Sequence, residues 1–216
     1  MNIILFGPPG AGKGTQADKL VKIFNLFKIS TGDLLRQEIK KNTYIGLKIK
    51  PLIDKGFLAP NDIIDDLIDK VLSDKNHKNR LIFDGYPRNV DQAKQLDLLV
   101  KKYNQKISCV LSLDVDKNTL IKRILGRQTC TKCGLIFNKY FNPSTNKEHL
   151  CDPRFLDKRP DDNEKTVINR FETYIEKTLP ILDFYKEQNL LHQINGTGEI
   201  DQIFNKIRTI MASLET

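Results

Sequence analysis

Long apolar runs are missing from this 216-residue sequence. None approaches the roughly 18 residues that a membrane-spanning helix needs, which argues against a transmembrane protein. Residues 1–6 lack the basic segment, the long apolar segment and the small-residue cleavage site of a signal peptide. Low-complexity tracts, internal repeats and long linkers are also missing. These absences predict a cytoplasmic protein with no membrane partner.

Cysteine is scarce, with four residues in the chain. Cys109 lies in an apolar stretch and is expected to be an inert core residue. Cys130, Cys133 and Cys151 instead cluster in one segment. Because disulfides are rare in cytosolic proteins, this clustering favours a metal site over a disulfide.

Negative charge is in the minority, since 35 Lys and Arg face 27 Asp and Glu for a net charge of +8. A basic balance favours polyanionic partners, and both nucleic acid and small phosphorylated ligands are polyanions. The lysines are spread through helix-like segments, as on solvated faces, whereas several arginines stand at the ends of predicted elements. The composition, 39% hydrophobic and 29% charged, is that of a globular protein with a core.

Short apolar runs alternate with longer segments of helical periodicity. The runs have the length and residue types of strands, and they lie at residues 2–6, 27–29, 81–84, 107–114 and 190–194. Helical patterns lie near residues 13–25, 61–73, 90–103, 116–125, 164–188 and 199–214. Pro180 is expected to kink the helix at 164–188. This alternation predicts an α/β fold with a five-stranded parallel sheet flanked by helices.

Two stretches interrupt the alternation. Residues 30–60 hold two short helical patterns, one on either side of Asn42. Residues 126–162 are rich in turn formers, carry three cysteines and alternate at 135–137 as a small β element does. Ligands of open α/β sheets bind at the carboxyl ends of the strands, so insertions there can cover a ligand.

A glycine-rich loop follows the first predicted strand. Residues 7–15 read GPPGAGKGT and open a helix, which is the context that a P-loop requires. Backbone N–H groups in such a loop surround phosphate oxygens, and Lys13 adds a full charge. Gly14 stands where the general motif has Ser or Thr, and the hydroxyl comes one place later at Thr15. That variant resembles the nucleoside monophosphate kinases.

Two later segments also follow predicted strands. Residues 30–36 read STGDLLR, in which Thr31 either caps the next helix or meets a ligand. Residues 81–88 read LIFDGYPR and bring Asp84 to a strand end, where a carboxylate can hold Mg²⁺ or its waters. Arg88 follows and can bind a phosphate through two N–H groups.

Taken together, these motifs make the sequence resemble the adenylate kinases with a long lid, over essentially the whole chain. The resemblance rests on residues 7–15, 30–36, 84–88 with Gln92, 123–127 (RILGR) and 159–162 (RPDD) with Arg170. It implies transfer of the γ-phosphoryl group of ATP to AMP, giving two ADP. It also implies a P-loop kinase core with two inserted flaps that close and exclude water. The core would be residues 1–29, 60–125 and 163–216, the AMP-binding flap 30–59 and the lid 126–162.

The resemblance further implies a role for individual residues. The catalytic residues would be Lys13, Arg88, Arg123, Arg159 and Arg170. ATP would be bound by Gly10, Ala11, Gly12, Lys13, Gly14, Thr15, Arg123, Arg127, Ile136, Phe137 and Gly198. AMP would be bound by Thr31, Arg36, Phe57, Leu58, Ala59, Gly85, Arg88, Gln92, Arg159 and Arg170, with Gln92 reading the adenine edge. Asp84 would hold, through water, the Mg²⁺ that accompanies ATP.

The cysteine cluster resembles the zinc knuckle in the lids of many such kinases. A structural zinc site needs four ligands, and the thiols of Cys130, Cys133 and Cys151 supply three. Arg154 stands where the family has Cys or Asp, which leaves Asp152, Asp157 or His149 as the fourth ligand. We expect bound Zn²⁺ completed by Asp152 or Asp157; a metal-free lid with relic thiols is the alternative.

Other functions compete with this interpretation. A UMP/CMP kinase shares the motifs, but the long lid and Gln92 argue against it. A zinc-ribbon nucleic-acid binder would leave the P-loop unexplained, and a P-loop ATPase or switch protein would not need the arginines on the acceptor side. The expected partners are therefore ATP, AMP and ADP, with no nucleic acid, and the protein is expected to be a monomer because closing flaps must be free to move.

Overall fold

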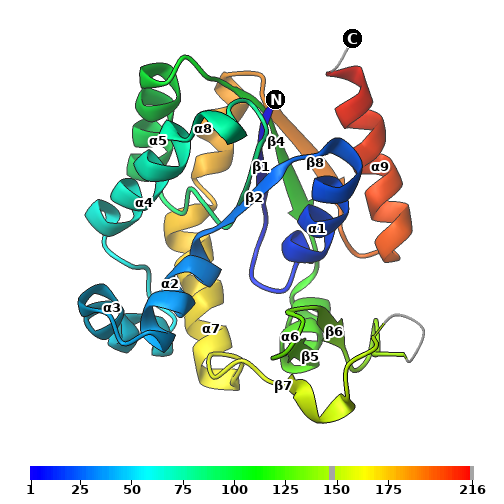
Figure 1. Ribbon diagram of the computed structural model, residues 1–216. Helices are drawn as coiled ribbons and strands as arrows, with labels where there is room; N and C mark the ends of the chain where they lie inside the picture. Colours follow the sequence, from blue (N-terminus) through cyan, green and yellow to red (C-terminus); the bar gives the residue numbers. More distant parts are fainter. Residues whose placement is uncertain (146–148, 215–216) are drawn as a thin grey trace.

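The computed structural model describes residues 1–145 and 149–214 of the chain. A five-stranded parallel sheet of order β2-β3-β1-β4-β8 forms its centre, with helices on both faces (Figure 1). The strands are β1 (Asn2–Phe6), β2 (Phe27–Ser30), β3 (Leu81–Asp84), β4 (Ile107–Asp114) and β8 (Leu191–Asn195). All five predicted strands, and the α/β fold itself, are confirmed.

The two faces of the sheet are covered by different helices, because both faces are apolar. In β1, Ile4 and Phe6 pack on one side and Ile3 and Leu5 on the other. One face is covered by α1 (Lys13–Phe24) and α9 (Ile200–Ser213). The opposite face is covered by α4 (Asn61–Ser73), α5 (Val90–Lys102) and α8 (Ile181–Glu187). Because all five strands are parallel, their carboxyl ends lie along the same edge of the sheet, and α1 begins there.

The first interruption folds as two helices beside this edge. They are α2 (Thr31–Lys40) and α3 (Tyr44–Asp54), joined through Asn42, whose φ of 50° is left-handed. Ser30, not Thr31, caps α2, since its hydroxyl accepts a hydrogen bond from the N–H of Asp33. The Thr31 hydroxyl instead donates to the carbonyl of Gly85 at 2.9 Å. The capping interpretation of Thr31 is thus wrong.

The predicted helix at 164–188 is three segments. These are α7 (Glu164–Thr173), a wider π-helical turn at Tyr174–Thr178, and α8 after Pro180. The predicted break at Pro180 is confirmed, but the change in winding begins six residues earlier. Two contacts tie α7 to the end of α3: the Thr166 hydroxyl donates to the carbonyl of Asp54 at 3.1 Å, and the Asn169 amide donates to that of Lys55 at 3.1 Å.

The second interruption follows α6 (Lys117–Leu125) and forms a separate small sheet (Figure 1). Its antiparallel order is β6-β5-β7, with β5 at Arg127–Cys130, β6 at Ile136–Asn138 and β7 at Leu156–Asp157. The alternation at 135–137 predicted β6 and missed the other two strands. A 3₁₀ turn at Pro153–Phe155 precedes β7, and another at Lys75–His77 precedes β3. Within the described residues, none of the helices combines the length and the apolar character needed to cross a membrane.

Candidate active site

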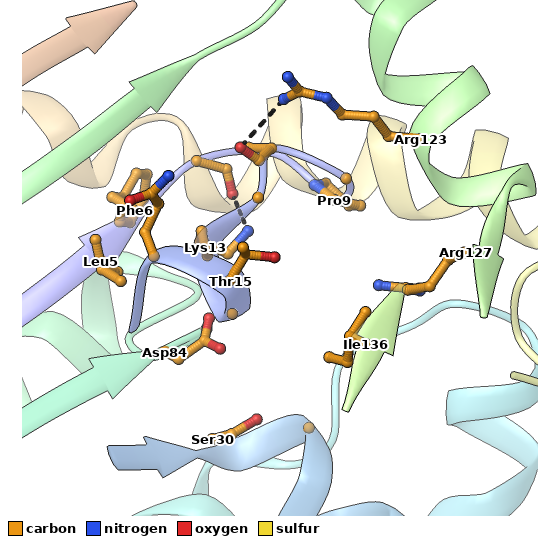
Figure 2. A pocket seen from close by; sticks show the side chains of 18 of the residues that line it. Leu5, Phe6, Pro9, Lys13, Thr15, Ser30, Asp84, Arg123, Arg127 and Ile136 are labelled. Carbon is orange, nitrogen blue, oxygen red and sulfur yellow. Dashed lines mark hydrogen bonds between the residues drawn. The ribbon is translucent and has the colours of Figure 1, made fainter. Parts of the chain in front are cut away.

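The loop between β1 and α1 has the geometry of a phosphate site. Gly10 and Gly12 hold φ values of 84° and 92°, which are rare for residues with a side chain. A Cβ on Gly10 would also lie 2.8 Å from Ile124. Lys13 folds back to donate to the carbonyls of Gly7 at 2.6 Å and Pro8 at 2.9 Å. Its ammonium therefore lies inside the loop, next to the start of α1 (Figure 2).

Two groups of opposite charge, Lys13 at the start of α1 and Asp84 at the end of β3, lie near each other at this edge of the sheet. Asp84 ends β3, directly beside Leu5 of β1, and Figure 2 shows it facing Lys13 and Thr15. Burial lowers the pKa of Lys13 to about 8, although the charge of Asp84 opposes this shift. Burial raises the pKa of Asp84, opposed by Lys13 and Lys28. A partly buried carboxylate beside a phosphate loop fits a hydrated divalent cation.

Six arginines surround the same cavity, which holds about 440 Å³. They come from the core and from both inserted segments: Arg36, Arg88, Arg123, Arg127, Arg159 and Arg170. Burial, followed by the charges of Arg170 and Arg36, lowers the pKa of Arg88 to about 10. The pKa of Arg159 is also lowered to about 10, first by burial and then by the charges of Arg127 and Arg36. These crowded cations would be stabilised by a phosphate group.

Carboxylates hold several of these guanidinium groups. Asp162 accepts from Arg127, including from its Nε at 2.7 Å, and lies 3.4 Å from Nη1 of Arg170. Asp161 accepts from the same Arg170 nitrogen at 3.1 Å. Burial would raise the pKa of Asp161, but the surrounding arginines, led by Arg170, lower it below its ordinary value. These residues form ion pairs that pre-orient Arg127 and Arg170 toward the cavity.

Arg123 has a different role in the described structure. Its Nη1 donates to the carbonyl of Gly196 at 2.9 Å and lies 3.5 Å from that of Ala11, so it joins the P-loop to the loop after β8. The same guanidinium lies 5.5 Å from the centre of the Phe141 ring. Arg123 thus lies between the loops and an aromatic face, which suits a stacked base.

Every residue predicted to bind ATP lines the large cavity. It also contains Asp84 and, from the predicted AMP set, Arg36, Leu58, Gly85, Arg88, Arg159 and Arg170. A second, small cavity beside it is bordered by Thr31, Leu58, Ala59, Gly85, Arg88 and Gln92. Phe57 lines neither cavity and its side chain is 48% exposed.

Sequence reasoning missed several residues of these cavities. Tyr140, Phe141 and Asn142 line the large cavity just after β6; an aromatic pair beside a predicted β element was the available signal. Asn61, which opens α4 directly after Pro60, lines neither cavity but was also missed as a partner of Gln92. Its amide oxygen accepts from Gln92 at 2.9 Å.

The thiols form a separate cluster in the small sheet. The ligand atoms of Cys130, Cys133, His149 and Cys151 lie within 4.8 Å of one another. The His149 ring is fixed by Ser144 at 2.9 Å on Nδ1, and its buried Nε2 has no hydrogen-bond partner in the part of the chain that is described. Burial would raise the pKa of Cys130, but the N–H of Cys133 and neighbouring donors lower it to about 6.

The two aspartates that the sequence favoured as fourth ligand lie outside this cluster. Asp152 accepts from the N–H of Arg154 at 2.8 Å and pairs with that side chain at 3.0 Å. Asp157 accepts from the N–H of Lys158 at 2.7 Å. Neither belongs to the cluster, whereas His149, the third alternative, does. Spacing in the sequence did not show that His149 lies beside the thiols.

A cavity with a P-loop on one wall and a second group of arginines on the other suits two phosphorylated ligands at once, which defines the class of P-loop kinases. A family model described as "Adenylate kinase" matches residues 5–190. The chain belongs to the adenylate kinase family. Family membership confirms the prediction of an adenylate kinase, a phosphotransferase.

Similar proteins match along their full length. The adenylate kinase of Pelagibacter ubique strain HTCC1062 is 47% identical over 211 residues, covering 98% of this chain and 99% of that protein. The adenylate kinase of Enterococcus faecalis strain ATCC 700802 / V583 is 42% identical, with coverage of 98% and 99%. That of Methanocella arvoryzae strain DSM 22066 is 42% identical, with coverage of 99% and 100%.

Proposed function

We propose that the large cavity binds ATP with Mg²⁺ beside AMP and transfers the γ-phosphoryl group to AMP, giving two ADP. The observation that carries this proposal is the ring of six arginines and Lys13 around one cavity of about 440 Å³. An oxygen of the AMP phosphate bonds to the γ-phosphorus as the bond to the departing ADP oxygen breaks. The protein supplies position and positive charge, without a covalent intermediate.

The two nucleotides would occupy opposite walls. The P-loop, Lys13 and Thr15 would hold the ATP phosphates, with the ATP base beside Arg123 and bordered by Ile136 and Phe137. Arg36 and Arg88 would hold the AMP phosphate, and the small cavity at Gln92 would receive its base. Arg159 and Arg170 would stabilise the group in transit. Support comes from their common lining of the cavity.

Asp84 is the residue suited to the Mg²⁺ that accompanies ATP. Its partly buried carboxylate ends β3 beside the P-loop, and Gly14 brings no side chain toward it, since a Cβ there would lie 3.5 Å from Oδ2 of Asp84. Mg²⁺ bound to ATP would neutralise part of the charge on the phosphate oxygens. Asp84 would orient that ion through its water ligands.

Residues 30–59 and 126–162 would act as the AMP-binding flap and the lid. Arg159 of the lid lies 3.6 Å from Asp33 of the flap, so the two insertions approach each other over the cavity. Closure would exclude water, which otherwise competes with AMP for the phosphoryl group.

The thiol cluster of the lid would hold a structural Zn²⁺ through Cys130, Cys133, His149 and Cys151. The donor set fits: three thiols with one imidazole match the Cys₃His class of tetrahedral sites. The buried Nε2 of His149, which has no hydrogen-bond partner among the described residues, is itself an observation that points to a ligand. Zinc would order a lid that has few apolar residues and would take no part in phosphoryl transfer.

A panel of nucleoside monophosphates tests the proposed function. With ATP and Mg²⁺, the purified protein should convert AMP with a kcat/KM at least about 100-fold above that for CMP, UMP or GMP. Equal conversion of CMP or UMP would reassign the acceptor to a pyrimidine nucleotide and leave the fold unaffected. A cytoplasmic location and a monomeric state stay predictions, to be checked by fractionation and by sedimentation.

A further inference from the structure

Three side-chain amides form a chain behind the small cavity. Asn61 is the first residue of α4, Asn89 precedes α5, and Gln92 lies in the first turn of α5. Gln92 is buried, at 2% exposure, and borders the cavity. The Oδ1 of Asn61 accepts from Nδ2 of Asn89 at 3.0 Å and from Nε2 of Gln92 at 2.9 Å.

Backbone N–H groups fix the direction of this chain at both ends. The N–H of Gln92 donates to Oδ1 of Asn89 at 2.8 Å, and the N–H of Arg88 donates to Oε1 of Gln92 at 2.8 Å. A backbone N–H can only donate, so an amide oxygen must face it. The NH₂ groups of Asn89 and Gln92 must therefore both point toward Asn61. The Asn61 oxygen accepts from both.

The direction matters because a carboxamide has the same shape when it is rotated by half a turn. In one orientation Gln92 can accept from the amino group of adenine and donate to its N1. In the other orientation it can donate to the O6 of hypoxanthine and accept from its N1–H. The wrong orientation leaves buried donors facing donors, which is costly.

We propose that Asn61 is a positioning residue that makes the acceptor site selective for adenine over 6-oxopurines by preventing rotation of the Gln92 amide. This inference rests on the proposed binding of AMP at the small cavity. Asn89 transmits the backbone constraint to Asn61, and Arg88 supplies the second constraint through its N–H. The remaining NH₂ hydrogen and lone pair of Gln92 stay available for the base.

A purely structural role explains Asn89 but not Asn61. Asn89 caps α5, whereas no side chain caps α4, whose cap residue is Pro60. The Asn61 oxygen thus serves the two amides and not its own helix. A carboxylate at position 61 would offer the same acceptor atoms, which gives a conservative test of the interpretation.

The test compares AMP with inosine monophosphate (IMP) as acceptors, using saturating ATP and Mg²⁺. Wild type should prefer AMP by a kcat/KM ratio on the order of 100-fold or more. Asn61→Ala should lower that ratio by about tenfold or more, mainly by improving IMP relative to AMP. Asn61→Asp should keep the wild-type ratio. Asn89→Asp, which keeps the helix cap but removes the donor, should lower the ratio as Asn61→Ala does.

A role in folding alone would reduce kcat/KM for both acceptors equally and leave the ratio unchanged, which would overturn the inference while AMP remained the substrate. An Asn61→Asp variant that loses selectivity as Asn61→Ala does would overturn it as well. If wild type failed to phosphorylate AMP, the proposed function would fail, and the inference with it. Melting curves identify any variant that does not fold, and Asn89→Asp then decides the question independently of position 61.

Discussion

At the scale of single residues, the cost of burying charge shapes the catalytic centre. Lys13 donates to two backbone carbonyls, and burial brings its pKa from an ordinary 10.5 to about 8 although the charge of Asp84 opposes the shift. Such a lysine is still mostly charged at neutral pH. Incoming phosphates would stabilise the charged form and raise the pKa again.

ATP binding should therefore weaken at alkaline pH. Below pH 8 free Lys13 already carries its proton, so the Kd should be nearly constant. Above pH 8 free Lys13 is neutral and binding must take up a proton, so the Kd should rise by up to about tenfold per pH unit. Calorimetry with a non-hydrolysable ATP analogue, in buffers of different ionisation enthalpy, measures both the Kd and the proton uptake.

Lys13→Arg is the matched control, because a guanidinium keeps its charge across the range. Its Kd should show no break near pH 8, whatever its absolute value. A wild-type Kd that is flat between pH 7 and 9.5, with no proton uptake, would contradict the assigned role of the ammonium.

At the scale of elements, the small sheet β6-β5-β7 has a small core and a thiol cluster beside it. Exposed apolar residues, such as Leu135 and Leu150, surround the small sheet, while Phe137 and Cys130 are among its few buried apolar side chains. Metal coordination can provide the order that such a small element lacks.

The purified protein should carry about one Zn²⁺ per chain. His149→Ala should lower zinc affinity by about tenfold or more, since it removes one of four ligands. Asp157→Ala is the control and should leave zinc content unchanged. Removing zinc by mild chelation should lower the melting temperature by about 5 °C or more yet leave ATP binding to the P-loop intact. Elemental analysis and thermal melts measure these effects.

Metal-free protein purified under reducing conditions, with a melting temperature that ignores added zinc, would show the thiols to be a relic. If Asp157→Ala lost its zinc while His149→Ala kept it, the fourth ligand would be the aspartate and not the histidine.

At the scale of the whole molecule, charge connects the two inserted segments. Asp33 pairs with Arg36 inside the flap and lies 3.6 Å from Arg159 of the lid. Burial would raise the pKa of Asp33, but Arg36 and the other groups around it lower it, so the carboxylate stays charged at neutral pH. It is thus a permanent counterion between lid and flap.

Asp33→Asn should loosen the nucleotide-free closed form. Distances between spectroscopic labels at exposed Tyr44 and Arg154, attached through unnatural amino acids, should be longer in Asp33→Asn than in wild type without nucleotide. With ATP and AMP analogues both proteins should reach the same short distance, because bound phosphates replace the carboxylate. Identical distance distributions without nucleotide would show that this contact does not hold the segments together.

Much of the architecture was predictable because it depends on local rules. Runs buried on both faces, such as 107–114, predicted parallel strands, and the glycines of residues 7–15 predicted the phosphate loop. The fourth member of the thiol cluster was not predictable, because ligand spacing in sequence does not reveal how the lid folds back. Asn61 escaped notice because its amide matters only through Asn89 and Gln92, which lie about 30 residues away in the chain.

The sequence by itself determined the sheet, the P-loop and the membership of the adenylate kinase family, since periodicity and short motifs are properties of consecutive residues. Tertiary structure alone decided which polar groups meet: six arginines around one cavity, His149 among three thiols, and the direction of the amide chain from Asn89 to Gln92. These arrangements join residues from different elements. Only the folded backbone fixes their distances, and through them the charges and hydrogen bonds on which function depends.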